Sequence, residues 1–135
     1  MDGPEGASRC RQRIAEGLAR LERLAQGVAG RDPMIRASLY QYRRRCGAAG
    51  CRCQRGELHG GRALSVSEGG RSRGVSLAGV DMAQVERQVE AYRQWRQVRA
   101  KMVRSFTEVL KAVDELGRRR TLPVERLRRG GAGGK

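Results

Sequence analysis

The stretch ALSVSEGGRSRGVSL, residues 63–77, decides the fold of this chain because it has the pattern of a complete β-hairpin. Leu64 and Val66 alternate with serines, which is typical of a strand with one buried face. The pair Gly69-Gly70 then predicts a two-residue turn, since glycine readily adopts the positive φ angles of such turns. One face of the returning strand carries Arg71, Arg73, Val75 and Leu77.

A preceding strand is predicted over residues 34–42, MIRASLYQY, where apolar and polar residues again alternate. One face, suited to a core, carries Ile35, Ala37 and Leu39. The other face carries Arg36, Ser38, Tyr40 and Tyr42. We therefore expect a small three-stranded antiparallel sheet whose first connection is rich in cysteine. The tyrosines either stack on nucleobases or pack under a helix, and the pattern leaves both interpretations open.

Two amphipathic helices are predicted, one before the sheet and one after it. In residues 8–29 the apolar positions recur at steps of four and three, at Ile14, Leu18, Leu21, Ala25 and Val28. Residues 81–116 are predicted as one long helix, with Asp81 as N-cap and Gly117 as C-cap. A heptad pattern places Val85, Tyr92, Arg99, Phe106 and Val113 at one core position and Gln88, Trp95, Met102, Val109 and Leu116 at the other.

These elements predict an α+β fold with an N-terminal helix, a three-stranded antiparallel sheet carrying a cysteine loop, and a long coiled-coil-like C-terminal helix. We expect a single domain over residues 8–117. Residues 1–7 and the basic, glycine-rich residues 118–135 are expected to be disordered.

The net charge of +15 is concentrated in two parts of the chain. Residues 31–80 carry ten arginines and three acids, and residues 118–135 carry a net charge of +6. Residues 1–30 and 81–117 each carry a net charge of only +1. Clustered positive charge attracts polyanions, so this distribution favours nucleic-acid binding. The candidate contacts are Arg43, Arg44, Arg45, Arg52, Arg55, Arg71 and Arg73 for phosphates, with Tyr40 and Tyr42 for bases.

The segment CGAAGCRCQRGELHG, residues 46–60, holds three of the four cysteines and the only histidine. Three thiolates and one imidazole are the ligand set of a Cys₃His zinc site, so Zn²⁺ is the predicted cofactor, held by Cys46, Cys51, Cys53 and His59. In a regular strand, however, the thiols of Cys51 and Cys53 would point to opposite faces. The alternative interpretation is therefore a group of reduced thiols packed in a small core.

The start of the chain has no apolar signal region, and no apolar run is long enough to span a membrane. We therefore expect a cytoplasmic protein without a membrane partner, in a compartment where thiols stay reduced. Cys10 is expected to be a buried small residue of the first helix.

A likeness to a known pattern is found in four stretches of the sequence: SLYQYRRRCGAAGCRC, GELHG, LSVSEGGRSRGVSL and VEAYRQW. With them, the segment from Met34 to Ala112 resembles an uncharacterised bacterial and archaeal domain family with a C-G-x₃-C-x-C loop, an H-G hairpin and a long helix. Its members are often encoded near transposases, so the resemblance implies a DNA-associated, mobile-element context and no established activity.

This chain departs from that family after the H-G pair. The family usually continues with proline and a run of tyrosines, whereas Gly61, Arg62 and Ala63 stand here. The departure removes most of an aromatic row, which favours phosphate contact by arginine over base stacking at this strand.

An enzyme is not expected, because the sequence has one histidine and neither a Ser/His/Asp nor a paired-carboxylate arrangement. The leading hypothesis is a non-enzymatic, zinc-stabilised protein that binds nucleic acid, DNA rather than RNA. The alternative is a structural module that pairs through the long helix as a homodimer, with the charge serving solubility alone.

Overall fold

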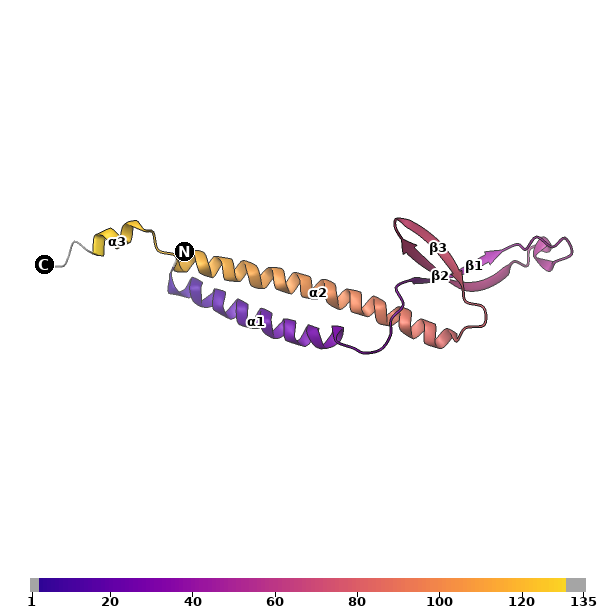
Figure 1. Cartoon of the computed structure of the whole chain (residues 1–135), viewed down its shortest axis with the longest axis horizontal. Coiled ribbons are helices and arrows are strands. Elements are labelled where there is room, and N and C mark those ends of the chain that lie inside the picture. Colours follow the sequence, from indigo (N-terminus) through magenta and orange to yellow (C-terminus); the bar gives the residue numbers. More distant parts are fainter. Residues whose placement is uncertain (1–2, 131–135) are drawn as a thin grey trace. The chain divides into compact units, whose positions relative to one another are not determined.

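A computed structural model describes residues 3–130 and divides the chain into two compact units (Figure 1). The sheet unit comprises Arg31–Arg96, and the helical unit comprises the residues up to Gly30 and those from Gln97 onwards. The elements in chain order are α1 (Pro4–Val28), β1 (Ser38–Arg44), the 3₁₀ helix η1 (Arg52–Arg55), β2 (His59–Glu68), β3 (Arg71–Ser76), α2 (Met82–Arg120) and α3 (Glu125–Gly130).

The α+β class and the order of the main elements are confirmed. The single domain over residues 8–117 stays a prediction, within which the contacts cluster into the two units. None of the helices in residues 3–130 is long and apolar enough to cross a membrane.

The helices extend further than the sequence pattern suggested. α1 begins at Pro4, within the segment expected to be disordered, because proline suits the first helical turn and Glu5 favours the positive end of the helix dipole. α2 does not end at Gly117: the backbone N–H and Oγ1 of Thr121 both donate to the Gly117 carbonyl, at 3.0 and 2.7 Å. α3 occupies part of the tail expected to be disordered, while the predictions for residues 1–2 and 131–135 lie outside the described residues.

The sheet is antiparallel, with strand order β1-β2-β3. The turn at Gly69 and Gly70 is confirmed, with φ angles of 58° and 79°. β1 begins at Ser38 rather than at residue 34, because the Ile35 N–H donates to the Gln88 carbonyl of α2, at 3.0 Å, instead of joining the ladder. β2 begins at His59, so the sheet extends to the cysteine loop.

The core of the sheet unit lies on one face of the sheet. Leu64, Leu77 and Val85 are buried, and the partly buried residues packed on them are Ile35, Ala37, Leu39, Val66, Val75, Met82 and Val89. Asp81 caps α2 as predicted, since its Oδ1 accepts a hydrogen bond from the Gln84 backbone N–H at 3.3 Å. The first turns of α2 therefore cover the apolar face of the sheet.

In the helical unit, α1 packs along the second part of α2 through a seam of small residues (Figure 1). Cys10, Gly17 and Leu21 are buried on α1, and the buried residues of α2 are Ser105, Val109 and Ala112. A Cβ atom built on Gly17 would lie 2.4 Å from Cγ2 of Val109, so the glycine lets the helices approach closely. Cys10 is buried, as expected.

One of the two predicted heptad core positions is wrong for this half of α2, whereas Val109, at the other position, is buried as predicted. Phe106 and Val113 were assigned to the core and are 51% and 43% exposed. The predicted register maximised the number of large apolar residues at core positions. The close seam instead takes the small residues Ser105 and Ala112, which lie one position before the predicted ones.

Candidate metal centre and basic surface

The strand pairing brings the histidine to the cysteine loop. In the β1–β2 ladder His59 lies directly opposite Arg44, the last residue of β1. Cys46 follows only two positions after Arg44. The antiparallel register therefore places two of the four predicted ligands at the same end of the sheet, although 12 residues separate them in the sequence.

A short helix brings the other two ligands together. Cys51 is the N-cap of η1 and Cys53 lies within it, so these residues are not part of a strand. The Gln54 N–H donates to the Cys51 carbonyl at 3.1 Å, and Gly56, at φ 100°, ends the turn with its N–H on the Cys53 carbonyl. The helical backbone turns both thiols to one side. The objection that they would point apart in a strand therefore does not apply.

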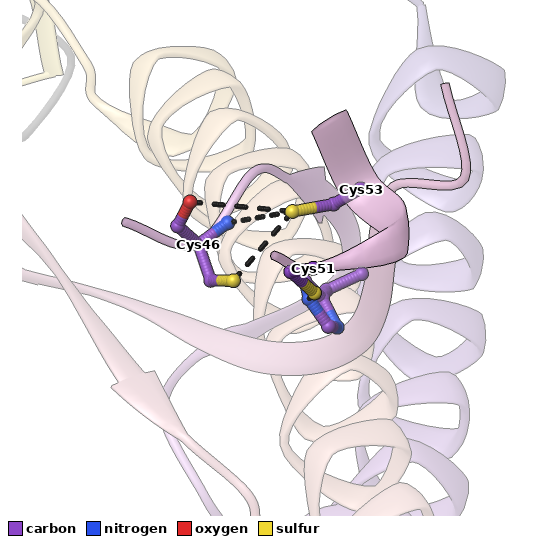
Figure 2. A group of neighbouring side chains, drawn as sticks. Cys46, Cys51 and Cys53 are labelled. Atoms are coloured by element: carbon purple, nitrogen blue, oxygen red, sulfur yellow. Dashed lines mark hydrogen bonds between the residues drawn. The ribbon is translucent and has the colours of Figure 1, made fainter. Parts of the chain in front are cut away.

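The four ligand atoms, the Sγ atoms of Cys46, Cys51 and Cys53 and a ring nitrogen of His59, all lie within 4.8 Å of one another. The sulfur atoms of Cys46 and Cys53 are 3.5 Å apart (Figure 2), and Cys51 Sγ is 3.0 Å from His59 Nε2. Tetrahedral Zn²⁺ with bonds of about 2.3 Å holds two sulfurs about 3.8 Å apart. All four cysteines are free thiols, and this cluster can hold a metal ion.

The thiols of Cys46 and Cys53 have opposite electrostatic environments. A backbone hydrogen bond from Ala48 lowers the pKa of Cys46, and hydrogen bonds from the thiols of Cys51 and Cys53 lower it further. Burial raises the pKa of Cys53, whose side chain is fully buried. Sγ of Cys53 also accepts a hydrogen bond from the Cys46 backbone N–H at 3.3 Å (Figure 2). Cys46 is thus the thiolate that forms more easily, and Cys53 gains more from a cation that stabilises its charge.

Five of the predicted arginines surround this cluster in the chain. Arg43 and Arg44 end β1, Arg45 directly precedes Cys46, and Arg52 and Arg55 begin and end η1. All five are exposed. Within the described residues none of them pairs with a carboxylate. The loop therefore presents uncompensated positive charge to solvent.

The structure does not bring Arg71 and Arg73 to this loop. Arg71 lies opposite Glu68, nine residues along β2 from His59, which corresponds to about 30 Å at 3.3 Å per residue. Arg73 forms an ion pair with Glu68 at 3.7 Å. These two arginines therefore lie at the far end of the sheet, and one of them is partly compensated.

The tyrosines lie on the face of the sheet that α2 does not cover. Side chains alternate along a strand, and Leu39 of β1 packs on the core, so Tyr40 and Tyr42 point to the opposite face. Tyr40 is 41% exposed, which excludes packing under the long helix. Arg44 lies on the same face, with its guanidinium carbon 4.8 Å from the centre of the Tyr42 ring.

Two further residues of this tyrosine face, Gly61 and Gly74, were not predicted from the sequence. Tyr42 lies opposite Gly61 in the ladder, and the hydroxyl of Tyr40 reaches Gly74 of β3. Only the strand register, which requires β2 to begin at His59, could have connected these glycines with the tyrosines.

No family model, curated protein or solved structure matches this chain. The resemblance of the segment from Met34 to Ala112 to a bacterial and archaeal domain family therefore stays a prediction.

Proposed function

We propose that this protein binds nucleic acid through arginines that a Zn²⁺-centred loop holds in position. The observation that carries the proposal is the convergence of three thiols and one imidazole within 4.8 Å, in a loop whose exposed arginines form no ion pair with a carboxylate of residues 3–130. An arginine guanidinium matches the geometry of phosphate oxygens and stays charged at all physiological pH values.

Zn²⁺ suits the ligand set, and its role here is structural. Soft thiolates with an imidazole favour zinc over calcium or magnesium, which prefer oxygen ligands. Four protein ligands fill a tetrahedral site and leave no position for a substrate or a reactive water. The metal would thus order residues 45–58, a connection with one fully buried side chain, Cys53. The mobile-element context is also part of this proposal and rests on the family resemblance alone.

Native mass spectrometry of the full chain tests the metal. We expect one Zn²⁺ per chain in the purified protein, and loss of that ion in Cys53→Ser. Cys10→Ser is the matched control, because Cys10 is a buried cysteine of the helical unit and is not one of the four clustered ligands. A chain that binds no Zn²⁺ after purification and reconstitution contradicts the zinc centre.

Fluorescence anisotropy with a labelled oligonucleotide tests nucleic-acid binding. Affinity should fall steeply with salt, because neutralising each phosphate releases a counterion. The variant Arg52→Glu/Arg55→Glu should bind more weakly and with a shallower salt dependence. The charge-matched control is Arg11→Glu/Arg23→Glu, at two exposed arginines of α1. Absence of binding at low salt, or an equal loss in both variants, counts against the loop as the binding surface.

A second candidate function is pairing with another copy of the chain through α2. One observation favours it: an apolar stripe at steps of three and four residues is exposed on α2, formed by Val103, Phe106, Leu110 and Val113. Leu18 of α1 is also 52% exposed. Arg99 lies near one end of the stripe and Asp114 near the other, so antiparallel pairing of two copies brings opposite charges together.

Sedimentation velocity at several protein concentrations tests this pairing. The chain should dimerise as its concentration rises, and Leu110→Glu should shift it to monomers, because a charge in a buried stripe is strongly unfavourable. Gln97→Glu adds the same charge at an exposed position of α2 outside the stripe and is the control. A protein that remains monomeric at all concentrations contradicts the pairing and leaves the nucleic-acid proposal intact.

A further inference from the structure

The tyrosine face of the sheet has two rings in a row on an otherwise small-residue surface. Tyr40, Tyr42 and Arg44 alternate along β1 and share this face. Direct pairing in the ladder adds small residues from the neighbouring strands, which are Ser65, Ala63, Gly61, Gly74 and Ser76. No large side chain of β2 or β3 therefore stands between the two rings and solvent.

The Tyr40 ring lies across the sheet rather than upright from it. Tyr40 is directly opposite Ala63 of β2, and its hydroxyl would be 2.8 Å from a Cβ atom built on Gly74 of β3. The side chain therefore extends from the edge strand over the middle strand. Ala63 is only 4% exposed although α2 covers the other face, so the ring is its cover. With 41% of Tyr40 still exposed, the outer side of the ring is open to solvent.

The Tyr42 ring covers Gly61 in the same way. A Cβ atom built on Gly61 would lie within 3.0 Å of three ring and hydroxyl atoms of Tyr42, so only glycine leaves room for it. Arg44 adds a guanidinium plane 4.8 Å from the centre of this ring. A shallow groove of about 250 Å³ lies on this face, and it is lined by Tyr40, Tyr42, Arg44, Ala63, Gly74 and Ser76.

These contacts reverse an expectation from the sequence. The sequence has Gly61 and Ala63 where an aromatic row was expected, and base stacking was therefore predicted to be weak at this strand. Instead, the small residues of β2 leave room for the two tyrosines of β1 to lie over them, with the Tyr40 ring open to solvent and the Tyr42 ring under the Arg44 guanidinium.

We propose that the tyrosine face binds unpaired nucleobases of single-stranded nucleic acid, which rests on the nucleic-acid function proposed above. Every base has a π-face that stacks on an aromatic ring, so such binding tolerates many sequences. Duplex DNA presents only base edges in its grooves, and flat rings on a sheet do not read those edges. Tyr40 and Tyr42 are about 6.6 Å apart along the strand. Two successive bases of an extended strand can therefore stack, one on the open face of Tyr40 and one against the Arg44 guanidinium that lies over Tyr42. Arg44 shares this face, whereas Arg43 points to the opposite face of the strand.

Anisotropy titrations of the full chain with three labelled probes test the proposal: a 12-nucleotide oligo-dT, a 12-nucleotide oligo-U and a 12-base-pair DNA duplex. We expect the single strands to bind more tightly than the duplex at the same salt. Tyr40→Leu/Tyr42→Leu keeps apolar cover over Ala63 and removes the π-faces. It should weaken single-strand binding about tenfold or more and leave duplex binding unchanged. The two single strands distinguish DNA from RNA as the source of the bases.

Two further variants keep the test decisive. Tyr40→Phe/Tyr42→Phe retains the rings and should bind like the parent chain. Tyr92→Leu is the matched control, since Tyr92 lies on α2, stacked on Trp95 at 5.9 Å, away from the tyrosine face. Ultraviolet cross-linking of the parent chain to oligo-dT, mapped by mass spectrometry, should identify the peptide containing Tyr40 and Tyr42 even if the leucine variant fails to fold.

The outcomes separate the two proposals. Binding of all three probes with no preference for single strands, or full single-strand binding by the leucine variant, overturns base stacking and leaves arginine–phosphate contact standing. Absence of binding to every probe at low salt overturns the nucleic-acid function itself, and base stacking with it.

Discussion

The helical unit and the cysteine loop of the sheet unit are ordered by different means. In the helical unit, a seam of small residues brings α1 against α2, and Gly17 sits so close to Val109 that it has no space for a side chain. In the loop, residues 45–58 have one fully buried side chain, Cys53, and four convergent ligand atoms. The difference teaches that van der Waals packing accounts for the order of one part of this chain, while the other has little packing and a cluster that can hold a metal ion.

The largest expected effect is a loss of order in the cysteine loop when its metal ion is removed. Removing Zn²⁺ with a chelator, or replacing Cys53 by serine, should release residues 45–58, because apparent binding energies at such sites are about 10 to 16 kcal/mol. Hydrogen exchange followed by mass spectrometry should report lost protection in the loop and unchanged protection in α1. Cys10→Ser should leave the loop protected. Equal protection with and without metal would mean that the thiols contribute packing alone.

The second prediction concerns the close seam between α1 and α2 in the helical unit. Gly17→Ala should lower the free energy of unfolding of the helical unit by about 1 to 3 kcal/mol, because the new Cβ meets the stiff Val109 side chain. Gly117→Ala, in an open part of α2, should instead raise it by about 1 kcal/mol through helix propensity. Urea unfolding followed by circular dichroism measures both. A stabilised Gly17→Ala variant would contradict the close seam.

The third prediction concerns the pH at which the thiols of the cysteine loop lose their protons. The metal-free protein should react with iodoacetamide at Cys46 at lower pH than at Cys53, because the pKa of Cys46 is lowered and that of Cys53 is raised. The same two pKa shifts determine how the stability of the fold depends on pH. The thiolate of Cys46 stabilises the fold above its unfolded pKa of about 8.5, and this is lost as pH falls through the lower folded value. The neutral thiol of Cys53 stabilises it below that unfolded value, and this is lost as pH rises through the higher folded value.

Mass spectrometry of the alkylated peptides over a pH series measures this order. The reverse order, with Cys53 modified first, would contradict the burial of Cys53. With Zn²⁺ bound, both thiols should be protected, and acidification should release the ion because protons compete for the sulfurs.

The smallest expected effect concerns an ion-pair group beside the seam. Glu115 accepts hydrogen bonds from Arg119 at 3.1 Å and Arg13 at 2.9 Å, and these lower its pKa. A lowered pKa stabilises the fold above the unfolded value of about 4.3, and this stabilisation is lost as pH falls below it. Glu115→Gln should therefore reduce the difference in unfolding midpoint between pH 7 and pH 3, whereas Glu22→Gln, at an exposed position, should not. An unchanged difference in Glu115→Gln would show that the pair is fully screened.

Local patterns were enough to predict the two long helices, the three strands and the candidate ligand set. The alternation around Leu64, the glycine turn, the Asp81 cap and the cysteine spacing each depend on neighbours in the sequence, and each is found in the structure. The start of α1 at Pro4 could also have been predicted from the sequence, because Pro4 and Glu5 are ordinary signals for the start of a helix.

The remaining features depend on distances between segments, which local patterns do not contain. The seam takes Ser105 and Ala112 in place of Phe106 and Val113 because Gly17 on the other helix allows a close approach. The 3₁₀ turn that aligns Cys51 with Cys53 has no periodic signature in four residues. The separation of Arg71 from the loop follows from the length of β2, which the pattern underestimated at its start.

The order of the strands leaves both β1 and β3 as open edges of the sheet. An open edge invites strands of other molecules to add to it, which is a route to aggregation, and charged residues on the edge oppose that addition. Arg43 and Arg44 on β1, and Arg71 and Arg73 on β3, thus act as gatekeepers that keep copies of the chain apart through mutual repulsion. A variant stripped of these charges should lose solubility, so light scattering belongs beside every binding curve measured on it.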